Sequence, residues 1–254
     1  MNRRHVVVAT LAILTFCSAQ RLAASVIDFE STPAATTPTD DAFLSAPYNL
    51  AGGGTVAFFF DTNGNLSFDP GTDARPVFEA YGADGNNGFS NAVTGIDDTA
   101  NGGLAGQLGN FFLRQLQPGS PPPPFIVDYN TAQTITGLSG EIWDIDGSPG
   151  NTEQWLVEAL DGSNNLLTSQ LSPLGNSGAL DGLPWVFSFS GLPAGFDKLQ
   201  ITFVGSKTSG LGLAFNNFDP FNPVPEPSGL ALLAVGGGLI AAVWRRGLDK
   251  NNRG

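Results

Sequence analysis

Residues 153–160 read Glu153-Gln154-Trp155-Leu156-Val157-Glu158-Ala159-Leu160, and the turn sequence Asp161-Gly162-Ser163-Asn164 follows directly. Successive side chains of a β-strand point in opposite directions, so Trp155, Val157 and Ala159 would share one face. The side chains between them would share the other face: Gln154, Leu156 and Glu158. This alternation predicts a strand whose tryptophan-bearing face lies in a protein core. The turn predicts that the chain then reverses into a second strand.

The same pattern extends along the second half of the chain. Short apolar or alternating segments recur there, separated by turns rich in Gly, Asp and Asn. We expect strands at 125–129, 134–145, 165–171, 185–190, 198–204 and 211–218. In the strand at 198–204, Leu199, Ile201 and Phe203 should face inward. The series predicts an all-β fold, an antiparallel β-sandwich.

The first half gives fewer strand signals. Val26 to Glu30 predicts the first strand, and residues 55–69 predict a hairpin around Asn63-Gly64. The second of these segments also resembles an EF-hand loop, although Leu66 and Thr72 stand where that loop needs Gly and Glu. Residues 70–105 read as a long loop, and 107–117 as a strand or a short helix. The long loop offers oxygen ligands for an ion, namely Asp84, Asn86, Asn87, Asp97 and Asp98.

Composition excludes several functions. The chain has 254 residues and a formal net charge of −12, but its basic residues gather at the two ends. Between residues 26 and 228 there are 4 basic and 22 acidic side chains. A nucleic-acid-binding protein needs a basic surface, so we expect no nucleic-acid partner. An acidic exterior favours cations, calcium above all.

Cysteine and histidine are nearly missing from the sequence. The single Cys17 and the single His5 both fall in the N-terminal segment that we assign to a leader. The rest of the chain therefore offers no disulfide, no Cys/His zinc site and no Ser-His-Asp triad. Any catalysis would depend on carboxylates, Tyr, Lys or Arg.

Residues 1–24 have the three parts of a secretory signal peptide. Arg3-Arg4-His5 form a basic start, Val6 to Phe16 form an apolar helix, and small residues follow at Ala23-Ala24. The apolar run is too short to span a bilayer. We therefore expect export, a signal helix that is removed, and a β-sandwich domain over 25–222.

The C-terminal segment 223–249 also has three parts. Pro225-Glu226-Pro227 should be extended and accessible, because two prolines fix φ and remove two N–H donors. Residues 229–243 carry no charge, and a transmembrane helix is expected over about 229–244. Arg245 and Arg246 then favour the cytoplasmic side. The alternative is a buried C-terminal helix of a globular domain.

This order of motifs resembles the PEP-CTERM sorting signal of bacteria. The resemblance implies that an exosortase in the inner membrane recognises the tail and cleaves it near Pro225 to Pro227. The body would then reach the cell surface or extracellular matrix. Such systems accompany exopolysaccharide and biofilm production.

The body resembles the jelly-roll domains common in PEP-CTERM proteins, which look like galactose-binding-type carbohydrate modules. The resemblance covers residues 134–219. It rests on three segments: Trp143-Asp144-Ile145-Asp146, Trp155 to Gly162, and Gly212 to Phe218. It implies that the first and last strands lie side by side and share a structural calcium ion. Its ligands would be Asp28, Glu30, Asn217 and Asp219, although these could equally be solvated edge positions.

Two further groups could carry function. Asp144 and Asp146, with Glu153 across a turn, form an acidic cluster that could be a catalytic carboxylate pair, a turn cap or an ion site. Trp143, Trp155 and Trp185 could stack on sugars. Trp155 fits the core better, so Trp185 is the candidate for ligand binding.

These observations favour a non-catalytic surface or matrix protein, with glycan as one possible ligand. The alternatives are a carbohydrate-active enzyme on a jelly-roll scaffold and a purely structural coat protein. The expected partners are an exosortase, an exopolysaccharide or other glycan, and transiently the inner membrane.

Overall fold

The alternating segment that begins at Trp155 forms strand β9 (Trp155–Asp161). It belongs to a computed structural model that describes residues 26–221, except 52, 84–87, 118, 133 and 194. Trp155, Val157 and Ala159 are all buried, whereas Leu156 and Glu158 are half-buried. The predicted core face of this strand is therefore confirmed.

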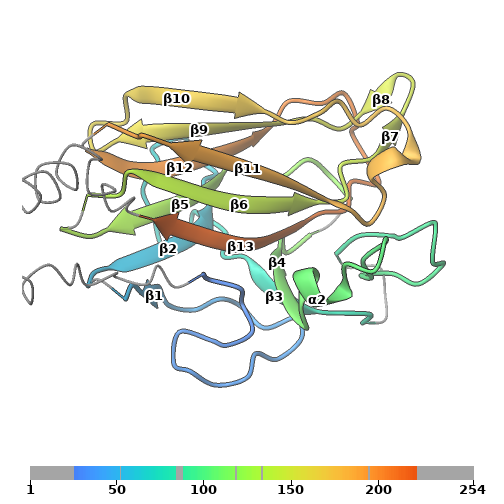
Figure 1. Ribbon diagram of the computed structural model, residues 1–254, viewed down its shortest axis with the longest axis horizontal. Helices are drawn as coiled ribbons and strands as arrows, with labels where there is room; N and C mark the ends of the chain where they lie inside the picture. Colours follow the sequence, from blue (N-terminus) through green and yellow to red (C-terminus); the bar gives the residue numbers. More distant parts are fainter. Residues whose placement is uncertain are drawn as a thin grey trace, which may run out of the picture. The chain divides into compact units, whose positions relative to one another are not determined.

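β9 lies in a six-stranded antiparallel sheet with the order β1-β2-β5-β12-β9-β10 (Figure 1). Its predicted reversal is confirmed, because β10 pairs with β9 directly after the 161–164 turn. On β12, Leu199 and Ile201 are buried and Phe203 is half-buried against the core, as predicted. The other strands are β1 (Tyr48–Asn49), β2 (Thr55–Phe60), β5 (Phe125–Asn130), β10 (Leu166–Leu171) and β12 (Phe196–Phe203).

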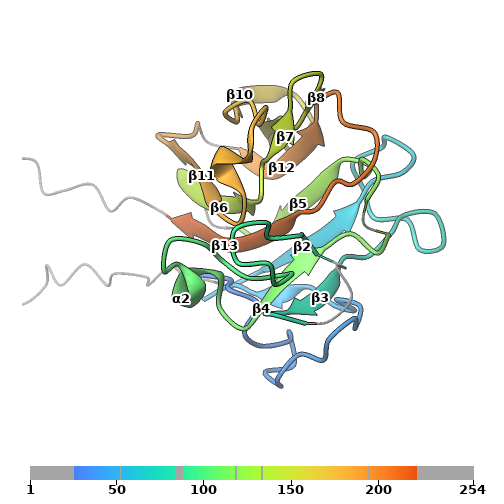
Figure 2. The same cartoon turned by 90° about the vertical axis from the view of Figure 1, so that its right-hand side faces the viewer.

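A second antiparallel sheet has five strands in the order β11-β6-β13-β4-β3. A two-stranded hairpin, β7–β8, and two short helices complete the described elements (Figure 2). The strands are β3 (Val77–Ala80), β4 (Phe111–Arg114), β6 (Gly137–Trp143), β7 (Gly147–Ser148), β8 (Asn151–Thr152), β11 (Pro184–Ser190) and β13 (Ala214–Phe221). The helices are α2 (Ala105–Leu108) and the 3₁₀ turn η1 (Gly178–Leu180).

Aromatic side chains from both sheets form the main core. Phe125 of β5 stacks on Phe215 of β13 with ring centroids 4.2 Å apart. Trp155 meets the same Phe215 ring edge-on at 5.9 Å. The two sheets thus bury their inner faces against each other, and the predicted all-β, antiparallel sandwich is confirmed.

The two ends of the domain are paired. The Ile27 N–H donates to the Phe218 carbonyl at 2.8 Å, and the Phe218 N–H donates back at 3.1 Å. The first and last segments therefore lie side by side, as expected. The predicted first strand is shorter than expected, because Phe29 has a φ of 58° and the pairing is a single bridge.

The predicted hairpin over 55–69 is wrong. β2 pairs with β1 and β5, and residues 61–73 form a loop around the buried Asp61. The Asp61 carboxylate accepts N–H groups from Asn63, Gly64 and Leu66, at 2.7–3.2 Å. Leu66 takes a φ of 61° there, where an EF-hand loop has glycine. Local carboxylate bonds therefore replace the strand pairing that the apolar pattern suggested.

The segment 107–117 was expected to be a strand or a short helix, and it contains parts of both. α2 ends at Leu108, and β4 begins three residues later.

Within the described ranges of the chain, no helix is long and apolar enough to cross a membrane. The predicted signal peptide 1–24 and the predicted transmembrane helix 229–244 lie outside those ranges.

Candidate metal centre

Three aspartates meet where β6 ends. Asp144 follows the last residue of β6 with a φ of 66°, and Asp146 comes two residues later, just before β7. Asp181 arrives from the turn after η1. One carboxylate oxygen from each of Asp144, Asp146 and Asp181 lies within 4.8 Å of the other two. This group could hold a metal ion.

The turn at Asp181-Gly182 fixes two of the three carboxylates. The Gly182 N–H donates to Asp144 Oδ1 at 2.8 Å. The Asp181 carboxylate accepts the N–H groups of Ala92 and Val93 at 3.2 and 3.1 Å. The loop that follows residue 88 is therefore attached directly to this corner of the sandwich.

Lys207 supplies the positive charge of the cluster. Its Nζ lies 3.1 Å from Asp146 Oδ1 and 2.5 Å from Glu153 Oε1. Glu153 is fully buried, and its backbone pairs with Gly175. A Cβ on Gly175 would lie 2.6 Å from the carbonyl oxygens of Ile145 and Asp146, so glycine lets the chain pass this close to the acidic corner.

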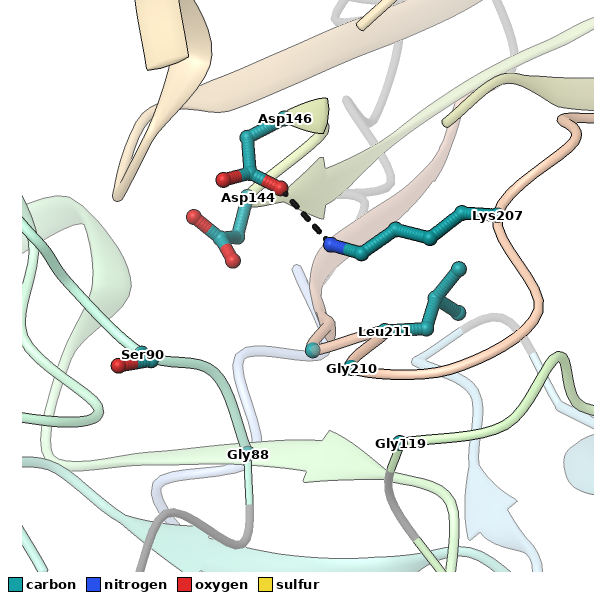
Figure 3. A pocket seen from close by; sticks show the side chains of 9 residues that line it. Gly88, Ser90, Gly119, Asp144, Asp146, Lys207, Gly210 and Leu211 are labelled. Atoms are coloured by element: carbon teal, nitrogen blue, oxygen red, sulfur yellow. Dashed lines mark hydrogen bonds and ion pairs between the residues drawn. The ribbon is translucent and has the colours of Figure 1, made fainter. Parts of the chain in front are cut away.

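A cavity of about 270 Å³ opens in front of these groups. Figure 3 shows the Asp144 carboxylate directed into it, with Asp146 and Lys207 joined at its edge. Ser90 lines the side formed by the loop that follows residue 88. The remaining lining residues are mostly glycines, at 88, 119, 210 and 212. Backbone thus approaches the cavity closely from several segments.

Burial dominates the electrostatics of the cluster. It raises the pKa of Asp144 well above the ordinary range, and the nearby charges of Asp146, Glu153 and Asp181 raise it further. Burial also raises the pKa of Glu153 to about 8, against the opposing effect of Lys207. Burial therefore disfavours the charged forms of Asp144 and Glu153, and a cation or protons must balance these carboxylates.

The sequence placed Asp144, Asp146 and Glu153 in one cluster, and the structure brings them together. Sequence reasoning missed Asp181 and Lys207, which lie 35 and 61 residues from Asp146 along the chain. For Asp181 the only local signal was the Asp-Gly turn that it begins. For Lys207 the only signal was that basic residues are scarce, since there are only 4 between residues 26 and 228.

Three of the four residues in the predicted calcium site line a separate cavity of about 470 Å³: Asp28, Glu30 and Asn217. Their polar atoms are bonded within the protein. Glu30 accepts N–H bonds from Asn110, at 2.5 Å to the backbone and 2.8 Å to the side chain. Asn217 donates to the Gln107 carbonyl at 2.8 Å and to Glu141 at 2.9 Å. Asp28 accepts the Glu30 N–H at 3.2 Å.

Asp219, the fourth predicted ligand, does not line that cavity. The register of β13 against β6 shifts between Asn216 and Asp219, and Asn217 has a φ of 52°. Asp219 then lies opposite Ser139, and burial raises the pKa of Tyr129, with a smaller contribution from the charge of Asp219. The bulge therefore separates Asp219 from the other three, and calcium binding by the four residues stays a prediction.

Trp185, the predicted glycan contact, is half-buried on the edge strand β11. Its ring lies 5.8 Å from Phe187 and packs against the main core. Trp143 and Trp155 are buried and unavailable to a sugar. The predicted sorting residues Pro225, Glu226, Pro227, Arg245 and Arg246 lie outside the described residues.

Comparison with known proteins gives little that bears on function. No model of a known family and no curated protein matches this chain. Among solved structures, the K1 cleaved adhesin domain of Lys-gingipain from Porphyromonas gingivalis W83 is similar over 65% of this chain and 97% of its own, at 17% identity and a TM-score of 0.31. The K3 domain of the same protein is similar over 64% of this chain and 88% of its own, at 14% identity and a TM-score of 0.29. At these scores neither match defines the function of this chain.

Proposed function

We propose that this chain is a secreted, exosortase-sorted protein of the cell surface or extracellular matrix. The observation that carries the proposal is the ordered tail: Pro225-Glu226-Pro227, an uncharged run over 229–243, then Arg245-Arg246. The leader at 1–24 supports it, because a sorting tail of this kind needs prior export. The exosortase acts near Pro225 to Pro227 and releases the body from the inner membrane.

The body acts as a non-catalytic module of the exopolysaccharide matrix. Residues 26–221 contain neither Cys nor His, so carboxylates carry nearly all of their acid–base chemistry. The module is a jelly roll of the galactose-binding type, and a glycan is its ligand. Trp185 on the edge strand is the contact that we assign to the sugar.

The sorting step is tested in a bacterium that has an exosortase. We expect the wild-type protein outside the inner membrane, with a mass that shows loss of the segment after about residue 225. Replacing Pro225, Glu226 and Pro227 together with alanine should leave the full tail in place and keep the protein in the membrane. Arg253→Ala, a charge change beyond the motif, is the control. Export of the triple variant with normal cleavage would refute the proposal.

Glycan binding is tested with a glycan array and the full chain, with and without calcium. Trp185→Ala should abolish binding to a defined polysaccharide. Val186→Ala is the matched control, because Val186 is the next residue of β11 and is 52% exposed. Absence of binding under both conditions would favour the structural coat protein, which predicts calcium-dependent self-association instead.

One observation favours the second candidate, a carbohydrate-active enzyme. Asp144 has a raised pKa beside Asp146 in a cavity, and a carboxyl group whose pKa is raised can serve as the general acid next to a second carboxylate. Release of reducing ends from a polysaccharide, lost in Asp146→Asn, would support this enzyme. Binding without turnover would support the matrix module.

A further inference from the structure

We propose that the cavity at the end of β6 binds one calcium ion through Asp144, Asp146 and Asp181, and that Lys207 releases Asp146 when the ion arrives. This site differs from the one expected at Asp28 and Glu30. The proposal does not depend on whether the protein binds glycan.

The carboxylates of the cluster must be balanced by a cation or by protons. Four carboxylates gather here, from Asp144, Asp146, Asp181 and Glu153, and Lys207 is the one ammonium that pairs with them in the described part of the chain. Three of the four acids are at most 4% exposed. Buried carboxylates are tolerated only when they are paired, neutralised by a proton or bound to a metal, and a metal ion can take the place of the protons.

Two carboxylate oxygens of the cluster have no hydrogen-bond partner among the described residues, and this observation is independent of the charge count. Glu153 is fully buried, and its Oε2 has no hydrogen-bond partner among the described residues. Asp144 is 4% exposed, and its single side-chain bond, from Gly182, uses Oδ1. Its other oxygen is free for an ion, and Figure 3 shows this carboxylate turned into the cavity. Buried polar groups in proteins are normally satisfied, so the unpartnered Oε2 of Glu153 needs an explanation, and the second oxygen of Asp144 is available to an ion in the cavity.

The geometry suits calcium. Calcium binds oxygen at about 2.4 Å, so two ligands on opposite sides of the ion are about 4.8 Å apart. The three aspartate oxygens lie within 4.8 Å of one another, so an ion can bridge them with little movement. Magnesium requires shorter bonds and an octahedron. Zinc prefers His nitrogen and Cys sulfur, and neither residue type lines the cavity.

The protein holds the aspartates in place before an ion binds. Asp181 is fixed by the N–H groups of Ala92 and Val93, and by the Asn101 amide at 3.3 Å. Asp144 is fixed by Gly182. Ser90 and the cavity of about 270 Å³ leave room for a hydroxyl and for water as further ligands.

Lys207 explains the free oxygen of Glu153. Its ammonium now bridges Asp146 and Glu153, through one oxygen of each. When calcium takes Asp146, the ammonium can turn wholly to Glu153 and donate to both carboxylate oxygens. A neutral Lys207–Glu153 pair then lies behind a calcium ion bound by three aspartates.

The test uses the full chain and calcium chloride, followed by isothermal titration calorimetry and thermal unfolding. Asp144→Asn is the informative variant, because asparagine tolerates a positive φ and its carbonyl can still accept the Gly182 N–H. We expect this variant to bind one calcium ion fewer than the wild type. Its Tm should be equal or higher in EDTA, since asparagine is neutral without having to bind a proton. The rise in Tm that calcium gives at this site should be lost.

Two control variants separate this site from others. Glu158→Gln removes a half-buried acid from β9 away from the cavity and should leave the calcium stoichiometry unchanged. Glu30→Gln removes a ligand of the other expected site and should leave the Asp144-dependent ion in place. Lys207→Met should tighten calcium binding at least about tenfold, because an adjacent ammonium opposes a divalent cation.

Three results would overturn the proposal. One is an unchanged stoichiometry in folded Asp144→Asn. Another is magnesium binding as tightly as calcium, which would contradict the assignment of the ion as calcium. The third is weaker calcium binding in folded Lys207→Met, which would show that the ammonium assists the ion rather than competing with it.

Discussion

Glu79 shows how a single buried acid affects the stability of this domain. It is fully buried on β3 and pairs with Arg114, which also binds Asp41. Burial raises the pKa of Glu79 to about 7, and the opposing contribution of Arg114 is smaller. Asp98 and Asp40 raise the pKa further. The ordinary value is 4.5, so the unfolded chain loses this proton first.

We expect Glu79→Gln to change the pH dependence of unfolding. In the wild type, the contribution of Glu79 is fully present below pH 4.5 and is lost as the pH rises through about 7. The loss amounts to at most about 3 kcal/mol, at 1.36 kcal/mol per pKa unit. The variant should lack this component in urea unfolding curves measured across that range. Glu158→Gln is the control, and an unchanged pH slope in Glu79→Gln would contradict the assignment.

The candidate metal centre shows which residues a sequence can reveal. Asp144 and Asp146 lie two positions apart, and Glu153 follows across a short turn, so local spacing groups them. Asp181 and Lys207 join only because η1 and the loop after β12 fold back onto the same corner. Contacts of this kind depend on tertiary packing, which periodicity does not encode.

Among the elements, the turn at Asp181-Gly182 connects the loop that follows residue 88 to the sandwich. Gly182 has a φ of 61°, and a Cβ there would lie 2.5 Å from Asn91 Nδ2. The Asn101 N–H also donates to the Gly182 carbonyl at 2.9 Å. The loop that follows residue 88 and the candidate metal centre are therefore held by the same turn.

Gly182→Ala should destabilise the protein by about 2 kcal/mol, from left-handed strain and from displacement of Asn91. The midpoint of urea unfolding measures this change. Gly178→Ala in η1 is a matched control, because its Cβ would have open space and the backbone needs no positive φ. Equal midpoints for the two variants would show that the turn bears no strain.

The strands predicted in the second half of the chain match the structure better than the hairpin predicted in the first half. From Phe125 onward, the predicted strands form, and most of them bury one face in the core. The hairpin over 55–69 was predicted from the same signals and is wrong. There, the Asp61 carboxylate satisfies the backbone N–H groups that a returning strand would have paired. Polar side chains next to turns can thus outcompete an apolar pattern.

At the scale of the whole molecule, buried acids make the domain most stable at mildly acidic pH. Burial raises the pKa of Asp98 to about 6 and of Glu153 to about 8, and it raises those of Asp128, Asp144 and Asp219. Groups with raised pKa values stabilise the fold while protonated. Between residues 26 and 228, 22 acids against 4 basic residues add repulsion once they ionise.

We therefore expect the Tm of the calcium-free protein to fall as the pH rises from about 5 to about 8. Circular dichroism at several pH values in EDTA measures this fall. Added calcium should reduce it, since the ion replaces protons at Asp144. A Tm that rises over this range in EDTA would contradict the role given to the buried acids.

The pairing of Ile27 with Phe218 determines how the domain responds to mechanical force. The two segments run antiparallel, so the chain enters at Val26 and leaves at Phe221 on the same side of this pair. A tensile load between these two points peels the pair open one bond at a time instead of shearing many bonds together. The N-terminal segment would detach first and take the Asp28–Glu30 corner with it. The candidate metal centre at Asp144 and Asp146 would stay intact until β13 itself is pulled from β6.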